Sequence, residues 1–506
     1  MADIPAATAR LRDVIAAGRI ADSHRPWPRA EIGEERWRQA IVMLSDSRLT
    51  LLGLWAEDAH VHMAVMDEAP GDFAVLSLAC PQGRFPSIGQ THPPAIRLER
   101  TIRDLWRMQP DGLTDLRPWL DHGTWREGNT NADATAYEFL PAEGESLHQI
   151  PVGPVHAGII EPGHFRFTAN GEAVVRLEER LGYAHKGIER LMAGSTVSRA
   201  AVLAGRVSGD STVAYALAFA RAAEAAHALA VPERAVWLRA LMAEFERLAN
   251  HFGDIGAICN DAAFGMMHAH CGHLREQVLR VSSQCFGHRL MMDRIVPGGV
   301  TQDLVSVAEL SIRSLLRDIR RRSPELMELY DNTASLQDRT VGTGVLSAAL
   351  ARQYGCGGYV GRASGRRFDA RRTPGYPPYD RLTFDVPVLD DGDVNARVWI
   401  RVREIEQSLS LIDQLLQGLP SGPIIGPGSD SSLRQPSEGI ALVEGFRGDI
   451  LVWLRLEDNG TIARCHLRDP SWFQWPLLEA AVEGNIVADF PLCNKSFNCS
   501  YSGHDM

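Results

Sequence analysis

Four long stretches with helical periodicity constrain the fold of this chain more than any other feature. They cover residues 211–230, 232–264, 301–322 and 393–418. Pro232 stands where a first helical turn tolerates proline, and residues 211–230 are rich in Ala, which lets neighbouring helices approach closely. Because long helices bury an apolar face by packing against one another, the sequence predicts a central helix bundle.

The first 145 residues show a different pattern. Short apolar runs at 49–55, 61–66 and 73–79 are separated by polar or Gly/Pro breaks, which predicts a small sheet, and a helical pattern follows at 96–108. The chain turns polar and small at 127–135, and Gly and acidic residues follow, so we place a domain boundary near residue 145.

We therefore predict an α+β protein with a small α/β domain over residues 1–145 and a mainly α domain over 146–506. Residues 418–439 read as a Gly/Pro/Ser linker. After it, Asp458-Asn459-Gly460 between two apolar runs predicts a β-hairpin. We expect such hairpins to be peripheral to the helix bundle.

Composition excludes several classes of protein. The formal charge of −11 argues against nucleic acid as a partner. The sequence has neither an apolar stretch long enough to span a membrane nor a secretory h-region. The eight cysteines form no C-x-x-C pair, which indicates reduced, mostly buried thiols in a cytosolic compartment.

An arginine-rich segment covers residues 362–372. It holds five arginines in eleven residues: Arg362, Arg366, Arg367, Arg371 and Arg372. These side chains are suited to clamping an anionic ligand or a partner subunit. The alternative is a solvated loop that pairs with local acids.

Titratable residues cluster at three further places. His156 and His164 flank Glu161 on a Gly/Pro-rich loop, where they would relay protons or simply cap turns. Asp261 falls in an otherwise apolar helical pattern at 258–267, so it is either a paired structural group or a functional one. His and Cys residues at 266–273 resemble a metal cluster, but helical spacing splits them into two pairs, which favours ordinary packing.

Ordered motifs over most of the chain resemble one family. From residue 153 onward the chain is similar to the 49-kDa subunit of respiratory complex I and to the large subunit of group 4, energy-converting [NiFe] hydrogenases. The matching motifs are Gly153-Pro154-Val155-His156, Gly182-Tyr183-Ala184-His185-Lys186-Gly187-Ile188-Glu189, Glu246-Arg247-Leu248-Ala249-Asn250-His251, Pro297-Gly298-Gly299-Val300, Arg362-Ala363-Ser364-Gly365 with Asp369 and Arg371, and Thr383-Phe384-Asp385-Val386-Pro387 with Gly392-Asp393-Val394. Residues 99–105 and 115–119 resemble the 30-kDa complex I subunit, fused here as in the formate-hydrogenlyase and hydrogenase-4 type.

The resemblance implies an oxidoreductase subunit with a hydrogenase-large-subunit-like domain. It implies docking on a small [4Fe-4S] subunit, next to antiporter-like subunits of a proton- or sodium-pumping membrane arm. The chain would then lie on the cytoplasmic face of the inner membrane as a peripheral subunit. NADH oxidation in complex I belongs to a distant flavin subunit, so an NADH dehydrogenase label would follow from family membership alone.

The chain departs from the hydrogenase pattern at all four metal ligands. Hydrogenase members hold Ni and Fe with two C-x-x-C pairs, because soft thiolates suit these metals. The first motif reads Arg206-Val207-Ser208-Gly209-Asp210, with Ser208 at one ligand position and the other deleted. In the C-terminal motif the ligand positions hold Ser500 and Gly503. We therefore expect no metal centre and no cofactor held directly by this chain.

The quinone-reducing branch surrounds the quinone head group with a His, a Tyr and an Asp. Asp261 matches the aspartate, the tyrosine falls in the deleted segment, and Glu161 with Pro162 stands in place of the histidine. Residues 161–166 instead resemble the hydrogenase loop whose glutamate passes protons.

The leading hypothesis is a metal-free redox subunit whose acceptor is quinone-like or unknown. Protons would pass through Asp261, Glu161, His164 and His156. We expect Arg206, Ser208 and Arg362 to face the cavity or the cluster-bearing subunit. The alternatives are a structural adaptor with a vestigial cavity and, least favoured, a true [NiFe] hydrogenase.

Overall fold

The computed structural model describes residues 10–123, 137–156, 160–304, 306–426 and 436–506. The predicted polar segment at 127–135 and residues 427–435 of the predicted linker lie outside the described residues. Helix and sheet are mixed throughout, so the α+β prediction is confirmed.

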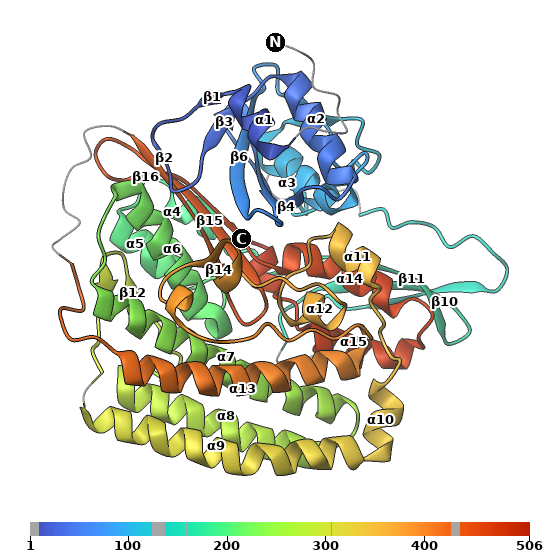
Figure 1. Ribbon diagram of the computed structural model, residues 1–506. Helices are drawn as coiled ribbons and strands as arrows, with labels where there is room; N and C mark the ends of the chain where they lie inside the picture. The colour runs from blue at the N-terminus through green and yellow to red at the C-terminus, as the bar shows by residue number, and fades with distance from the viewer. Residues whose placement is uncertain (1–9, 124–136, 157–159, 305, 427–435) are drawn as a thin grey trace.

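The predicted helix bundle forms the base of the molecule (Figure 1). It consists of α7 (Glu233–Asp261), α8 (Gly265–Phe286), α9 (Ser306–Asn332) and α13 (Val394–Gly418). The predicted helix over 211–230 is not part of this bundle but packs against the central sheet, and α8 was not among the four predicted helices. The predicted helix over 232–264 ends at Asp261, and the chain reverses into α8. The predicted helix over 301–322 is longer than expected and includes Pro324.

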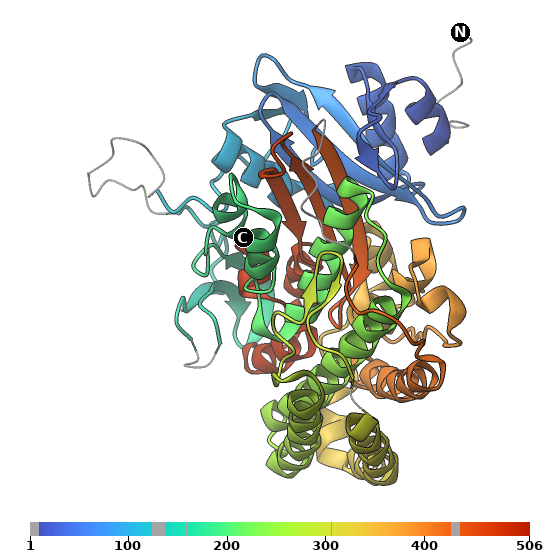
Figure 2. The same ribbon diagram turned by 90° about the vertical axis from the view of Figure 1, so that its left-hand side faces the viewer.

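A sheet lies at the centre of the protein. Its strand order is β16 (Ile462–Arg468), β15 (Asp449–Leu456), β14 (Ser437–Glu444) and β2 (His24–Arg25). The sequence predicts the β15–β16 hairpin correctly but not its place, because the strands are buried between the N-terminal sheet and α6 (Thr212–His227) (Figure 2). A second hairpin, β10 (His164–Asn170) and β11 (Ala173–Arg180), is peripheral as expected (Figure 1).

The N-terminal segment folds as the predicted small sheet. Its strand order is β1 (Arg19–Ile20), β3 (Arg29–Glu31), β6 (Asp72–Ala79), β5 (His60–Asp67) and β4 (Thr50–Glu57). The helices α1 (Leu11–Ala16), α2 (Glu34–Ser45) and α3 (Ile96–Trp106) accompany it. Strands β4, β5 and β6 and helix α3 match the predicted runs.

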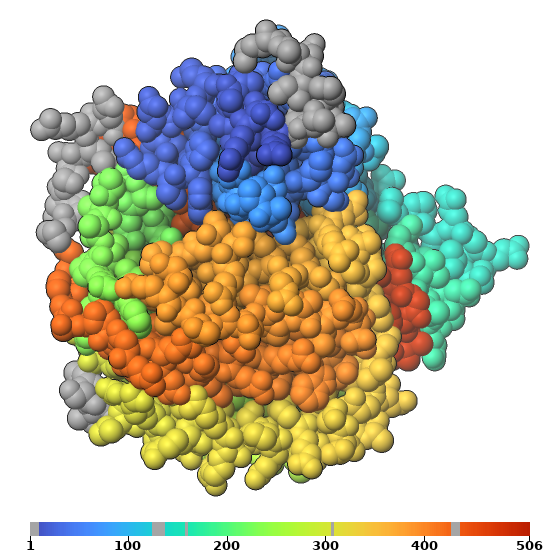
Figure 3. Space-filling model, in the orientation of Figure 1, coloured from blue at the N-terminus to red at the C-terminus, as the bar shows by residue number. Residues whose placement is uncertain are grey.

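The N-terminal segment shares its core with the rest of the chain. One cluster of buried apolar side chains joins residues from before and after position 145. Strand β2 pairs in parallel with β14, and Arg29 binds Glu438 at 2.7 Å. The space-filling view shows the two parts in continuous contact (Figure 3). The boundary near 145 stays a prediction.

The remaining elements are short. They are β7 (Arg84–Pro86), η1 (Pro93–Ala95), β8 (Gln109–Asp111), β9 (Leu147–Val152), α4 (Ile188–Met192), α5 (Val197–Ala204), η2 (Gly209–Ser211), β12 (Ile295–Val296), β13 (Gly299–Val300), α10 (Ala334–Thr340), α11 (Ala348–Gln353), α12 (Gly358–Ala363), η3 (Arg371–Gly375), η4 (Tyr379–Arg381), α14 (Ser471–Val482), η5 (Val487–Asp489), α15 (Phe490–Phe497) and α16 (Tyr501–His504). Among the described residues, none of the helices has the length and apolar character that crossing a bilayer requires.

Candidate active-site cavity

Two segments that are far apart in the sequence meet at one cavity of about 370 Å³. Residues 208–210, at the start of η2, form one wall, and residues 498–501, which connect α15 to the start of α16, form another. Glu161 enters from the loop before β10, Arg447 from the turn between β14 and β15, and Lys495 from α15. This cavity is therefore where the two altered metal-ligand motifs come together.

A fixed ion pair forms part of the cavity wall. The two terminal nitrogens of Arg447 donate to the two carboxylate oxygens of Asp210 at 2.6 and 3.0 Å. Arg447 Nε also donates to the carbonyl oxygen of Asn498 at 2.6 Å. Burial alone would raise the pKa of Asp210, but the charge and hydrogen bonds of Arg447 lower it to about 2. The pair thus stays ionised at neutral pH.

The loop carrying Glu161 is held against the C-terminal helix α16. The backbone N–H of Ser502 donates to Glu161 Oε2 at 3.0 Å. Two residues further on, a Cβ added at Gly163 would lie 2.6 Å from Cε1 of Tyr501, so only glycine fits this approach. The predicted proton-handling glutamate therefore lines the cavity in a defined position.

The two predicted histidines lie at different distances from the cavity. Nε2 of His156 is 3.4 Å from the hydroxyl of Tyr501, which lines the cavity. His164 lies on β10 behind the lining, with Nδ1 3.3 Å from the carbonyl oxygen of Gly153. Burial lowers the pKa of His164, which favours the neutral imidazole.

Asp261 does not line the cavity, but its carboxylate is close enough to feel the charge of Lys495, which does. Burial raises the pKa of Asp261, and the positive charge of Lys495 opposes this rise. The sequence pattern placed Asp261 within a continuous helix, but it is the last residue of α7. The chain turns at Ala263, whose φ is +63°, before α8 begins.

The three residues expected to face the cavity or a partner differ in their surroundings. Ser208 lines the cavity and donates to Asp210. Arg206 is half-buried outside the cavity lining and pairs with Asp293 at 2.7 Å. The prediction for Arg362 is wrong, because its side chain is fully buried, binding Glu404 at 2.7 Å and Glu444 at 2.9 Å. A guanidinium enclosed by carboxylates of its own chain presents nothing to a neighbouring subunit.

Sequence reasoning missed Arg447 and Lys495. Arg447 is flanked by Gly445-Phe446 and Gly448 in a tight turn between two apolar runs, and this pattern was the available signal. Lys495 had no distinguishing context in the sequence. Both approach the cavity only through tertiary packing, because β14 and β15 pack against α6 and α15 packs against α7.

A thiolate-held Ni–Fe centre does not fit this cavity. Cys499 is the one cysteine among the described lining residues, and burial raises the pKa of its thiol well above the ordinary value. At two of the positions where hydrogenases have thiolate ligands, this chain has Ser208 and Ser500, and their hydroxyls are poor ligands for soft metals. Within the described ranges no three His, Cys, Asp or Glu side chains group as a metal site. On α8, Cys271 is buried and His268, His270 and His273 are exposed.

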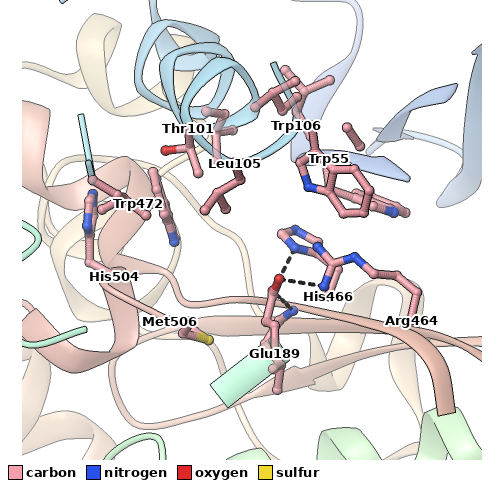
Figure 4. Close-up of a pocket in the computed structure, with 16 residues that line it drawn as sticks. Trp55, Thr101, Leu105, Trp106, Glu189, Arg464, His466, Trp472, His504 and Met506 are labelled. Atoms are coloured by element: carbon pink, nitrogen blue, oxygen red, sulfur yellow. Dashed lines mark hydrogen bonds and ion pairs between the residues drawn. The ribbon is translucent and has the colours of Figure 1, made fainter. Parts of the chain in front are cut away.

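A smaller cavity of about 40 Å³ lies between the N-terminal segment and the rest of the chain (Figure 4). Glu189 binds His466 at 2.9 Å and Arg464 at 2.7 Å on its floor, and Trp55 of β4 stacks on His466. Its volume suits a few water molecules rather than a substrate. The cavity of about 370 Å³, where the two altered metal-ligand motifs meet, is the candidate active site.

Comparisons with known proteins place this geometry in a family. Residues 261–439 match the family model described as the 49-kDa subunit of respiratory-chain NADH dehydrogenase. The chain is 30% identical to formate hydrogenlyase subunit 5 of Escherichia coli over 83% of its own length and 77% of the relative. It belongs to the complex I 49-kDa and hydrogenase large-subunit family.

Other members of the family agree with the fold. An NADH-quinone oxidoreductase subunit of Dehalococcoides mccartyi is 31% identical over 67% of this chain and 92% of its own. A chain of the membrane-bound sulfane sulfur reductase, an archaeal respiratory membrane complex, has a TM-score of 0.67 and 26% identity, and the match covers 71% of this chain and 99% of that one. The chain described here is thus related to subunits of both complex I and the group 4 hydrogenases.

Proposed function

We propose that this chain is the redox subunit of a complex I-like, ion-translocating membrane complex. Electrons from a [4Fe-4S] cluster in a neighbouring small subunit pass to an acceptor in the cavity of about 370 Å³ that Glu161 lines, here called the Glu161 cavity. No metal held by this chain takes part. The observation that carries the proposal is the cavity wall. Where hydrogenases place thiolates, this wall offers the carboxylate of Glu161, the Asp210–Arg447 ion pair and the ammonium of Lys495.

A quinone-like acceptor suits this arrangement. Reduction of a quinone to a quinol takes two electrons from the cluster subunit and two protons. The positive charges of Arg447 and Lys495 would stabilise negative charge that develops on the acceptor oxygens. Glu161 would donate protons directly, and Asp261 would supply them through Lys495. His156 would exchange protons through Tyr501, and His164 would support the same loop.

A second acceptor class follows from one relative. The complex that contains the structurally similar chain is named as a sulfane sulfur reductase. Reducing a sulfur–sulfur bond likewise takes two electrons and leaves two sulfur anions, which the positive groups of the wall would stabilise until protons neutralise them. Activity with polysulfide but not with quinones would favour this acceptor.

We place the chain peripherally on the cytoplasmic face of the inner membrane. Its partners would be a small [4Fe-4S] subunit and antiporter-like membrane subunits. The support comes from relatives that are subunits of respiratory membrane complexes. Pull-down of such subunits with a tagged chain tests this assignment.

The function is tested on the complex purified through a tag on this chain. We expect iron without stoichiometric nickel, together with quinone reductase activity. Glu161→Gln should lower turnover roughly 10²-fold or more, because it removes a proton donor at the acceptor. The matched control, Glu172→Gln, changes an exposed glutamate in the β10–β11 turn and should leave turnover unchanged.

Two results would contradict the proposal. Stoichiometric nickel would show that a metal centre forms despite the lost thiolate ligands. Iron with intact assembly but no activity towards quinones or polysulfide would favour the structural adaptor, which the lost ligands also support. Asp261→Asn separates the roles further: reduced turnover with intact assembly keeps Asp261 in the proton path, and unchanged turnover removes it.

A further inference from the structure

The arginine-rich segment does not act as one unit. Arg362 and Arg371 are buried in a network of carboxylates. Arg366 and Arg367 instead line a separate cavity of about 590 Å³, larger than the Glu161 cavity. This interdomain cleft lies between the N-terminal segment and α11, which faces that segment in Figure 1.

The interdomain cleft is positively charged, although the whole chain is acidic. Five guanidinium groups line it against two carboxylates, those of Asp67 and Glu68. The guanidiniums belong to Arg10, Arg48, Arg352, Arg366 and Arg367. Because the formal charge of the chain is −11, this local excess is not a general property of its surface.

Arg366 forms a rigid floor. Its side chain is 5% exposed, and Nη1 donates to the carbonyl oxygen of Cys356 at 2.9 Å. It forms an ion pair with Glu68, which also accepts a hydrogen bond from Thr50. The ring of Phe368 lies 4.4 Å beneath the guanidinium. Of the two carboxylates in the cleft, that of Glu68 is therefore already paired with Arg366.

Two arginines at the opening are free to bind a ligand. Arg352, on α11, and Arg367 have exposed side chains, and their guanidinium groups form neither a hydrogen bond nor an ion pair with any residue that the structure describes. Gly365, at φ +80°, directly precedes Arg366 and Arg367 in the sequence and also lines the cleft. Outside the lining, Asp46 pairs with Arg48 at 3.4 Å and Asp390 lies against Gly365, and neither carboxylate forms an ion pair with Arg352 or Arg367.

We propose that the interdomain cleft binds a small organic phosphate that carries at least two negative charges. Arg352 and Arg367 would clamp the phosphate oxygens, because guanidinium forks match this geometry. Met43, Leu44 and Leu49 line the opposite wall and would contact the apolar part of the ligand. The volume falls in the range of small-molecule sites. This site is separate from the Glu161 cavity and shares none of its lining residues.

The test is isothermal titration of the purified full chain at low ionic strength. We expect saturable binding of ATP and weaker binding of pyrophosphate, both diminishing as salt is added. Adenosine, which lacks the phosphates, should not bind measurably. The double variant Arg352→Glu/Arg367→Glu should lower the affinity for ATP roughly 10- to 100-fold.

A matched control separates the site from general attraction of anions. Arg403→Glu changes an exposed arginine on α13, outside the cleft, and should leave ATP affinity within about twofold. Circular dichroism checks that each variant is folded. Absence of saturable binding to the wild-type chain, equal losses in the control, or ATP binding no tighter than pyrophosphate would overturn the proposal.

Discussion

Arg362 lies in a buried network in which carboxylates outnumber guanidiniums. The members are Arg247, Arg362, Arg371, Glu244, Asp369, Glu404 and Glu444, together with His251, which binds Glu404 at 2.8 Å. Burying an unpaired negative charge is costly, so the network favours uptake of a proton. Burial, helped by the charge of Asp369, raises the pKa of Glu444 to about 7.

This raised pKa makes stability depend on pH. The ordinary pKa of a glutamate side chain is 4.5, so between that value and about 7 the folded chain binds more protons than the unfolded chain. The contribution of Glu444 to stability is therefore complete at low pH and is lost as pH rises through this window. Glu444→Gln should reduce the fall in unfolding free energy from about pH 5 to about pH 7.5 by a few kcal/mol.

Urea unfolding at a series of pH values measures this slope. Asp458→Asn, an exposed residue in the β15–β16 turn, is the control and should keep the wild-type slope. An unchanged slope in Glu444→Gln would assign the proton to another carboxylate of the network.

A second residue-scale prediction compares two arginines of the same segment. Arg362→Met leaves Glu404 and Glu444 without their buried partner, which should cost about 3–5 kcal/mol of unfolding free energy. Arg367→Met removes an exposed, unpaired side chain and should change it by less than about 0.5 kcal/mol. The midpoints of urea denaturation measure both. Similar losses in the two variants would contradict the burial argument.

At the scale of elements, the turn between β14 and β15 packs against the start of α12. Gly358 has a φ of +66°, and a Cβ there would lie 1.8 Å from the carbonyl oxygen of Arg447. Gly358→Ala should therefore cost several kcal/mol and displace the arginine that lines the Glu161 cavity. Gly460→Ala, at φ +79° with nothing within 4 Å, should cost only about 1 kcal/mol of backbone strain. Thermal unfolding compares the two, and equal losses would exclude the steric contact as the cause.

The same elements show what the sequence predicts and what it does not. Asp458-Asn459-Gly460 predicts the hairpin, because these residue types favour that turn locally. The end of α7 at Asp261 was not predictable, because the following Ala262 and Ala263 are good helix formers and only packing forces the turn. Nor did the sequence of the arginine-rich segment distinguish the buried Arg362 from the exposed Arg367. The partners of Arg362 are 42 and 82 positions away in the sequence.

For the candidate site, the motifs led to the Glu161 loop and to residues 208–210 and 498–501, and the structure brings all three together. That neither His164 nor Asp261 is among the lining residues depends on how β10 and α7 pack. Local sequence carries little information about such long-range packing.

At the scale of the whole molecule, the shared core indicates that the N-terminal segment and the rest of the chain unfold together. Trp37, on α2, is fully buried in the cluster that spans position 145, and its indole N–H donates to the carbonyl oxygen of Pro86 at 3.1 Å. Val42, on the same helix, is 43% exposed. Truncating each side chain therefore separates a loss of core packing from a change on the surface of the same helix.

We expect calorimetry of the full chain to show one transition. Trp37→Ala should cost about 3–5 kcal/mol and lower the temperature of that single transition by roughly 3–5 °C, because the cavity destabilises one cooperative unit. Val42→Ala should leave the transition within about 1 °C of wild type. Two transitions, with Trp37→Ala lowering only the first, would show instead that the N-terminal segment unfolds independently. In that case the shared core and the pairing of β2 with β14 would join two separate units without coupling their stability.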